Sequence, residues 1–309
     1  MTRPLQISAP GSLMVLGEHA VLHGFPCLVA AINHRVRVSL LPRNDGLVNL
    51  TSALGDYEAD RDDLPDHPSF RFVLAALRQR PRALPGGLDA VITADMPPTI
   101  GFGTSAAVTV AMLGALHVAC GDPLDPAALL PEARTVIQHV QGRGSGADAA
   151  ASCLGGVVRY ALPETAASRL SDAATPITAL YCGYKKPTPD VIAWVDDRWR
   201  DRRDALHALY ARIGANVDRA ATALNRHDAA AWHLALDEGQ SLMEELGVNT
   251  PELAACVAAL RRSPGIGGAK ISGSGLGDCV IGWGRATGST PPEFPRYDVT
   301  VAQEGVRCD

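Results

Sequence analysis

The residues most capable of chemistry begin with a glycine-rich stretch at 97–106, PPTIGFGTSA. Gly101 and Gly103 precede Thr104 and Ser105, and glycines let a backbone approach a ligand closely. If a helix starts here, its first N–H groups and its dipole favour an anion. The stretch can therefore cradle a phosphate, although an ordinary glycine turn before a helix capped by Ser or Thr explains the same residues.

Three other stretches contain polar residues in unusual surroundings. Glu18 and His19 interrupt the apolar run of 8–24, SAPGSLMVLGEHAVLHG, which is compatible with a polar surface turn. Asp148 lies among small residues in QGRGSGADAAASC, where the usual role of an isolated Asp is to cap a helix. The glycines of GAKISGSGLGDC, at 268–279, are compatible with a hairpin turn. Each stretch alone is a weak signal.

The elements around these stretches follow from apolar periodicity. Alternation of β-branched residues predicts a strand at 87–95, and the apolar spacing after Thr104 predicts a helix, so the glycine loop lies between a strand and a helix. The same patterns predict an α+β protein, and Pro131 is expected to break the helix at 125–141. The other predicted strands lie at 34–42, 154–163 and 176–184, and the predicted helices at 68–80, 125–141, 203–224, 228–247 and 249–262.

Composition excludes several classes of protein. The chain has 309 residues, enough for two domains, with 47% hydrophobic and 20% charged residues. The net charge of −5 argues against nucleic-acid binding. Seven cysteines without a CxxC pair predict reduced thiols rather than zinc or disulfides. Without a signal peptide or membrane-length apolar run, we expect a cytoplasmic protein with no membrane partner; a homodimer is left open.

Taken together and in this order, the four stretches resemble the GHMP small-molecule kinase superfamily, and most closely its mevalonate kinases. The resemblance runs from Ser8 to Cys279. It implies a two-domain fold, with an ATP-binding domain like ribosomal protein S5 domain 2 at 1–165 and a ferredoxin-like domain at 166–309. It also implies ATP as phosphoryl donor, with Mg²⁺.

The resemblance assigns roles to individual residues. Asp148 matches the catalytic aspartate, Glu18 and His19 match a substrate-side pair, and Thr188 maps loosely to a substrate-proximal segment. The residues implied to contact ATP phosphates are Pro97, Gly101, Gly103, Thr104, Ser105, Ala106, Gly273, Ser274 and Gly275, with Ser105 also contacting the metal.

Three positions depart from the family pattern. Ser12 replaces a lysine, Ile137 replaces a metal-binding glutamate, and Asp278 replaces a glycine. The lost positive charge could come from Lys185, Lys186 or Arg143.

Three functions remain open at this point. The leading hypothesis is phosphorylation of mevalonate, since galactokinases follow the GEH motif with Thr-Asp where this chain has Ala20-Val21. The others are a GHMP kinase or decarboxylase acting on a sugar or another small alcohol, and a non-catalytic ligand sensor.

Overall fold

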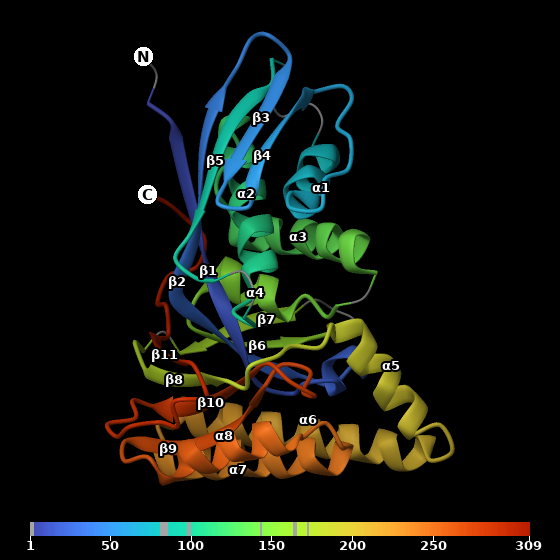
Figure 1. The fold of residues 1–309 in the computed structure, drawn as a ribbon, viewed down its shortest axis with the longest axis vertical. Helices are drawn as coiled ribbons and strands as arrows, with labels where there is room; N and C mark the ends of the chain where they lie inside the picture. The colour runs from blue at the N-terminus through green and yellow to red at the C-terminus, as the bar shows by residue number, and fades with distance from the viewer. Residues whose placement is uncertain (1–2, 81–85, 98–99, 143, 163–165, 172) are drawn as a thin grey trace.

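The computed structural model describes residues 3–80, 86–97, 100–142, 144–162, 166–171 and 173–309 and contains two β-sheets with helices packed on them (Figure 1). The large sheet has the order β12-β1-β2-β5-β3-β4, and β6 pairs with β2 and carries β7. Its strands are β1 (Leu5–Leu16), β2 (Cys27–Pro42), β3 (Leu47–Ser52), β4 (Gly55–Asp60), β5 (Leu88–Ala94), β6 (Val157–Ala161), β7 (Ala166–Ser171) and β12 (Arg307–Cys308). The α+β architecture expected from the sequence is confirmed.

The helices of this half enclose one central helix, α2 (Thr104–Ala119). Eleven of its sixteen residues are buried, because it packs against β1 and β2 on one side and against other helices around it. This explains a sequence that is apolar all round rather than on one stripe. The surrounding helices are α1 (Arg71–Gln79), α3 (Pro126–Gln141) and α4 (Ala147–Leu154).

The expected break at Pro131 does not occur, since α3 runs unbroken from Pro126 to Gln141. Pro131 lies on the exposed side of α3, where water can bind the carbonyl that loses its N–H partner. Asp125 caps α3 by accepting a hydrogen bond from the N–H of Ala127.

The small sheet has the order β11-β8-β10-β9 and forms a second layer with three helices (Figure 1). α7 packs on β9, α6 packs on α7, and α8 contacts β9 and β10. The elements are β8 (Pro176–Tyr181), α5 (Thr188–Arg198), α6 (Arg203–Asn225), α7 (Ala229–Leu246), α8 (Pro251–Arg262), β9 (Ile266–Ser272), β10 (Cys279–Gly284) and β11 (Arg296–Thr300); the short 3-10 helix η1 (Ala20–His23) follows β1. None of the described helices is long and apolar enough to cross a membrane.

The chain crosses between the two layers more than once. β7 pairs with β6 in the large sheet, so we propose that the domain division lies between β7 and β8 rather than after residue 165. Beyond β11 the chain returns: Val301 bridges Ile32, and β12 pairs with β1. The buried Arg35 guanidinium donates hydrogen bonds to the carbonyl oxygens of Glu304 and Gly305, which fastens the returning segment.

Candidate active site

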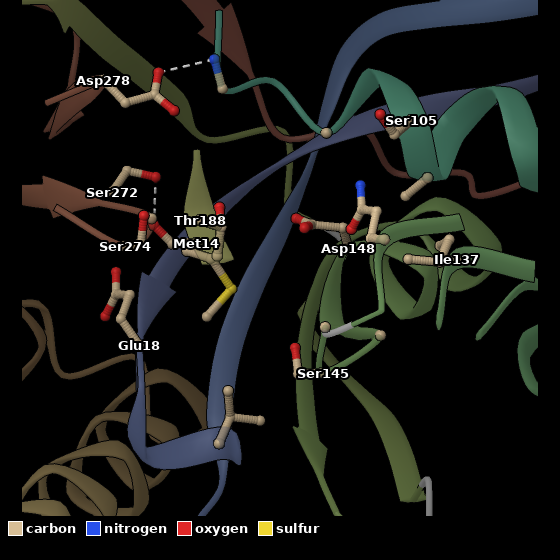
Figure 2. A pocket seen from close by; sticks show the side chains of 18 of the residues that line it. Met14, Glu18, Ser105, Ile137, Ser145, Asp148, Thr188, Ser272, Ser274 and Asp278 are labelled. Carbon is tan, nitrogen blue, oxygen red and sulfur yellow. Dashed lines mark hydrogen bonds between the residues drawn. The ribbon is translucent and has the colours of Figure 1, made fainter. Parts of the chain in front are cut away.

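A cleft of about 260 Å³ lies where the loop before α2 meets the loop between β9 and β10 (Figure 2). It brings together the four stretches singled out in the sequence. Its lining includes Glu18 and His19 after β1, Asp148 on α4, Thr188 on α5, Gly101 and Gly103–Ala106 around the start of α2, and Gly273, Ser274 and Asp278 after β9.

The glycine loop delivers the start of α2 to this cleft. Gly103 is the N-cap residue and adopts a left-handed conformation with φ of 66°. The expectation that Thr104 or Ser105 caps the helix is wrong, because both lie inside the first turn and no side chain makes the capping hydrogen bond. The N-terminal end of α2 is thus left for an anion in the cleft.

Two of the residues expected to contact phosphates lie elsewhere. Pro97 is exposed and does not line the cleft. Gly275 also lies off the lining, where an added Cβ would stand 2.6 Å from the Cβ of Val248. The close packing against Val248 explains the glycine without a ligand.

Asp148 points into the cavity from the first turn of α4 (Figure 2). Ser12 Oγ donates a hydrogen bond to its Oδ1 at 2.7 Å. Burial raises the pKa of Asp148, while the hydrogen bond from Ser12 and the charge of Lys185 lower it and the charge of Asp278 raises it. The raised pKa makes the Asp148 carboxylate a stronger base, and the hydrogen bond from Ser12 fixes its orientation. A proton acceptor requires both properties.

Ser12 shares a tight contact with Gly103. A Cβ built on Gly103 would lie 2.0 Å from Ser12 Oγ, and Ser12 itself is fully buried. A side chain at position 103 would therefore collide with Ser12, which explains the glycine there.

Ile137 lines the cleft from α3 and offers an apolar wall where a carboxylate was expected. Within the described ranges, no group of three or more His, Cys, Asp or Glu side chains is arranged to hold a metal ion. Ser105 supplies a hydroxyl at the start of α2.

Asp278 connects the two sides of the cleft. Its Oδ1 accepts a hydrogen bond from the N–H of Gly101 at 2.9 Å, and its Oδ2 lies 2.9 Å from Lys185 Nζ. Of the three cations considered as replacements for the missing lysine, Lys185 lines the cleft and Lys186 does not, while Arg143 lies outside the described residues.

Glu18 and His19 are buried, with 4% and 6% of their surface exposed, so the alternative of a polar surface turn is wrong. Glu18 Oε1 accepts a hydrogen bond from the fully buried Lys270, whose pKa is lowered by burial and raised by Glu18. His19 Nε2 donates to the carbonyl oxygen of Ser274 at 2.8 Å, and burial lowers the pKa of this imidazole. Sequence reasoning did not identify Lys270 as the partner of Glu18, although a charged residue inside strand β9 is an unusual feature.

Three family models match the chain. The model described as GHMP kinases N terminal domain matches residues 70–156, and GHMP kinases C terminal matches residues 220–289. A galactokinase galactose-binding signature matches residues 2–42.

Curated relatives match over most of their length. A mevalonate kinase of Aeropyrum pernix is 30% identical over 296 residues, which cover 91% of this chain and 89% of the relative. A mevalonate kinase of Archaeoglobus fulgidus is 30% identical over 306 residues, which cover 98% of this chain and 99% of the relative.

Solved structures share the fold at lower identity. A Lin0012 protein from Listeria innocua superposes with a TM-score of 0.86 at 18% identity, covering 99% of each chain. An L. major mevalonate kinase in complex with R-mevalonate superposes with a TM-score of 0.78 at 21% identity, covering 98% of this chain and 96% of the other.

Proposed function

The chain belongs to the GHMP kinases, and from this premise we propose that it transfers the terminal phosphoryl group of ATP to mevalonate, forming 5-phosphomevalonate. The two relatives described above carry the name mevalonate kinase and align along nearly the whole chain. The two matched GHMP domains contain Asp148 and both glycine-rich loops of the cleft.

The observation that carries the proposal is the position of Asp148. It lines one cleft together with Ser105 at the start of α2 and with Glu18 and His19 after β1 (Figure 2). A base in this position can serve an acceptor hydroxyl on one side and face a phosphoryl donor on the other.

The phosphate side of the site consists of the first turn of α2 and the loop after β9. We assign the phosphates of ATP to the backbone of Gly103–Ala106, with Gly273 and Ser274 on the opposite wall. The dipole and the N–H groups at the start of α2 stabilise negative charge there.

Asp148 acts on the acceptor side. As the acceptor oxygen forms its bond to the γ-phosphorus and the bond from that phosphorus to the β–γ bridging oxygen breaks, the hydroxyl proton passes to the Asp148 carboxylate and ADP leaves. The hydrogen bond from Ser12 and the charge of Lys185 both favour the ionised form that can accept the proton.

The residues fit a Mg²⁺ ion whose ligands are mostly phosphate oxygens and water rather than protein side chains. Mg²⁺ prefers oxygen ligands, and the Ser105 hydroxyl lines the same cleft as the Asp148 carboxylate. Ile137 contributes none, so phosphate oxygens and water would complete the coordination. Ser105 would hold the ion, which supplies neutralisation of phosphate charge.

The acceptor side suits a small, partly apolar alcohol. Met14, Val21, Leu22 and Ile192 line the cleft together with Glu18 and His19. Such a wall fits the methyl and methylene groups of mevalonate. Thr188 begins α5, whose positive dipole end favours the mevalonate carboxylate.

A sugar is the second candidate acceptor. The galactokinase signature matches residues 2–42, the segment that contains Glu18 and His19. Against it, Val21 and Leu22 present aliphatic groups to the cleft, whereas a sugar needs polar partners for its hydroxyls.

The test is an acceptor panel with direct measurement of ADP. We expect kcat/KM to be highest for mevalonate and lower for galactose, homoserine and phosphomevalonate. A preference for galactose would replace the proposal with the sugar kinase. ATP binding without turnover of any acceptor would favour a non-catalytic sensor.

A further inference from the structure

The described lining of the cleft contains a single Lys or Arg side chain, that of Lys185. Three carboxylates, those of Glu18, Asp148 and Asp278, line the same space. Lys270 pairs with Glu18, and Lys185 pairs with Asp278. A polyphosphate entering this cleft therefore finds no unpaired cation among the described lining residues unless the pair of Lys185 and Asp278 separates.

The Asp278 carboxylate is held by the kind of donors that bind a phosphate oxygen. One oxygen accepts the backbone N–H of Gly101 and the other faces the ammonium of Lys185, both at 2.9 Å. A backbone N–H beside a lysine is a common arrangement around phosphates. A Cβ at Gly101 would lie 2.2 Å from the carboxylate, so only glycine permits this approach.

The backbone at Asp278 is fixed independently of its side chain. The N–H of Asp278 donates to the carbonyl oxygen of Tyr184 at 2.7 Å, and its carbonyl oxygen accepts the N–H of Cys182 at 3.0 Å. Tyr184 in turn donates its hydroxyl to Glu252 at the start of α8. A rotation of the side chain alone can thus release Gly101 and Lys185 while the loops stay in place.

We propose that Lys185 and the N–H of Gly101 form a subsite for a phosphate oxygen of the nucleotide, and that Asp278 occupies this subsite until the phosphate displaces it. The inference rests on the proposed use of ATP. It adds Lys185 as a residue that binds the nucleotide and Asp278 as an anion that competes with the phosphate. Asp278 lowers the affinity of the cleft for free polyphosphate, because the incoming charge must separate an existing ion pair.

Two other roles for Asp278 make different predictions. If it were a fixed brace for the glycine loop, its hydrogen bond to Gly101 would matter and its charge would not. If it were a metal ligand, its effect would appear only with Mg²⁺. Both of its oxygens already face positive donors, which favours the role of a competing anion.

The test is calorimetric binding of inorganic tripolyphosphate, and in parallel of ATP, in EDTA. Asp278→Asn keeps an oxygen for the Gly101 N–H and tolerates the left-handed φ of 75° at this position, but removes the charge. We expect it to bind tripolyphosphate about tenfold more tightly than the wild type, and Lys185→Gln about tenfold more weakly. The matched controls Asp190→Asn and Lys186→Gln change exposed charges outside the lining and should stay within about twofold.

An unchanged or reduced affinity of folded Asp278→Asn overturns the proposal in favour of the brace, and an effect confined to Mg²⁺ buffers overturns it in favour of the metal ligand. Should Asp278→Asn fail to fold, Asp278→Gly removes both charge and backbone strain and must still tighten binding. Tripolyphosphate binding needs no acceptor. Failure to phosphorylate mevalonate would therefore refute the proposed function and leave this result standing.

Discussion

Replacing Ser12 with alanine should move the pH profile of the enzyme rather than abolish activity. The acid limb of kcat/KM reports the pKa of the essential base in the free enzyme. If that base is Asp148, the wild-type limb lies above 3.8, the ordinary value for Asp, because burial raises its pKa. Removing the Ser12 hydroxyl takes away a hydrogen bond that lowers this pKa, so the limb moves to still higher pH.

The size of the shift follows from the strength of that hydrogen bond. A hydrogen bond to a charged group contributes about 1.5–3 kcal/mol, and one pKa unit corresponds to about 1.4 kcal/mol. Water in the cleft can partly replace the hydroxyl, since Asp148 is only half-buried, so we expect a shift of about one unit. Above the limb, both forms hold an ionised Asp148, and their rates should differ by less than about tenfold.

The assay is kcat/KM for mevalonate between about pH 4.5 and 9, with ADP separated by ion-exchange chromatography so that no coupling enzyme limits the range. Ser152→Ala is the matched control. Ser152 is fully buried and lies on α4, the helix that carries Asp148. Its hydroxyl donates a hydrogen bond at 2.8 Å to the carbonyl oxygen of Pro10, which lies on β1 as Ser12 does. An unshifted limb in Ser12→Ala, or an equal shift in Ser152→Ala, would refute the reasoning.

Two further predictions concern Asp148 itself and the buried pair of Glu18 and Lys270. Asp148→Asn should lower kcat by roughly 10²–10⁴-fold with little change in the KM for ATP, because the amide keeps the bond from Ser12 but accepts no proton; near-wild-type turnover would mean that Asp148 is only structural. Lys270→Met should lower the free energy of unfolding in urea by about 3–5 kcal/mol, since it leaves Glu18 buried without its cation, and adding Glu18→Gln should recover part of the loss. Equal stability of the single and double variants would show that the charge pair is not the cause.

Local patterns in the sequence predicted the elements that carry the phosphate side of the cleft. Alternation over 87–95 corresponds to β5 at Leu88–Ala94, and the apolar run after Thr104 to α2. The side chain of Asp125 caps α3, and that of Thr250 caps α8 by accepting a hydrogen bond from the N–H of Leu253. Such caps can be predicted from sequence, because a cap depends on residues within one turn. Pro131 was misjudged, because whether a helix tolerates proline depends on which face is exposed.

The partners of the site residues could not be predicted, because they are distant along the chain. Ser12 and Asp148 are separated by 136 positions, and Glu18 and Lys270 by 252. Only the packing of β1 between α4 and β9 brings them together. Gly103 illustrates the same limit: its place beside a phosphate site could be inferred, but its contact with Ser12 could not.

The return of the chain to the large sheet bears on synthesis at the ribosome. β1 is among the first strands to emerge, yet its edge receives β12 only after residues 307–308 have been made. Until then Arg35 has neither of its carbonyl partners at Glu304 and Gly305, although its bonds to Ser8 can already form. While the ribosome translates the small sheet, the β1 edge that later pairs with β12 is therefore still open. During the same period the Arg35 guanidinium lacks two of its hydrogen-bond acceptors. Nascent chains stalled before residue 301 should consequently be far more sensitive to protease, and more dependent on chaperones, than chains that include the returning segment.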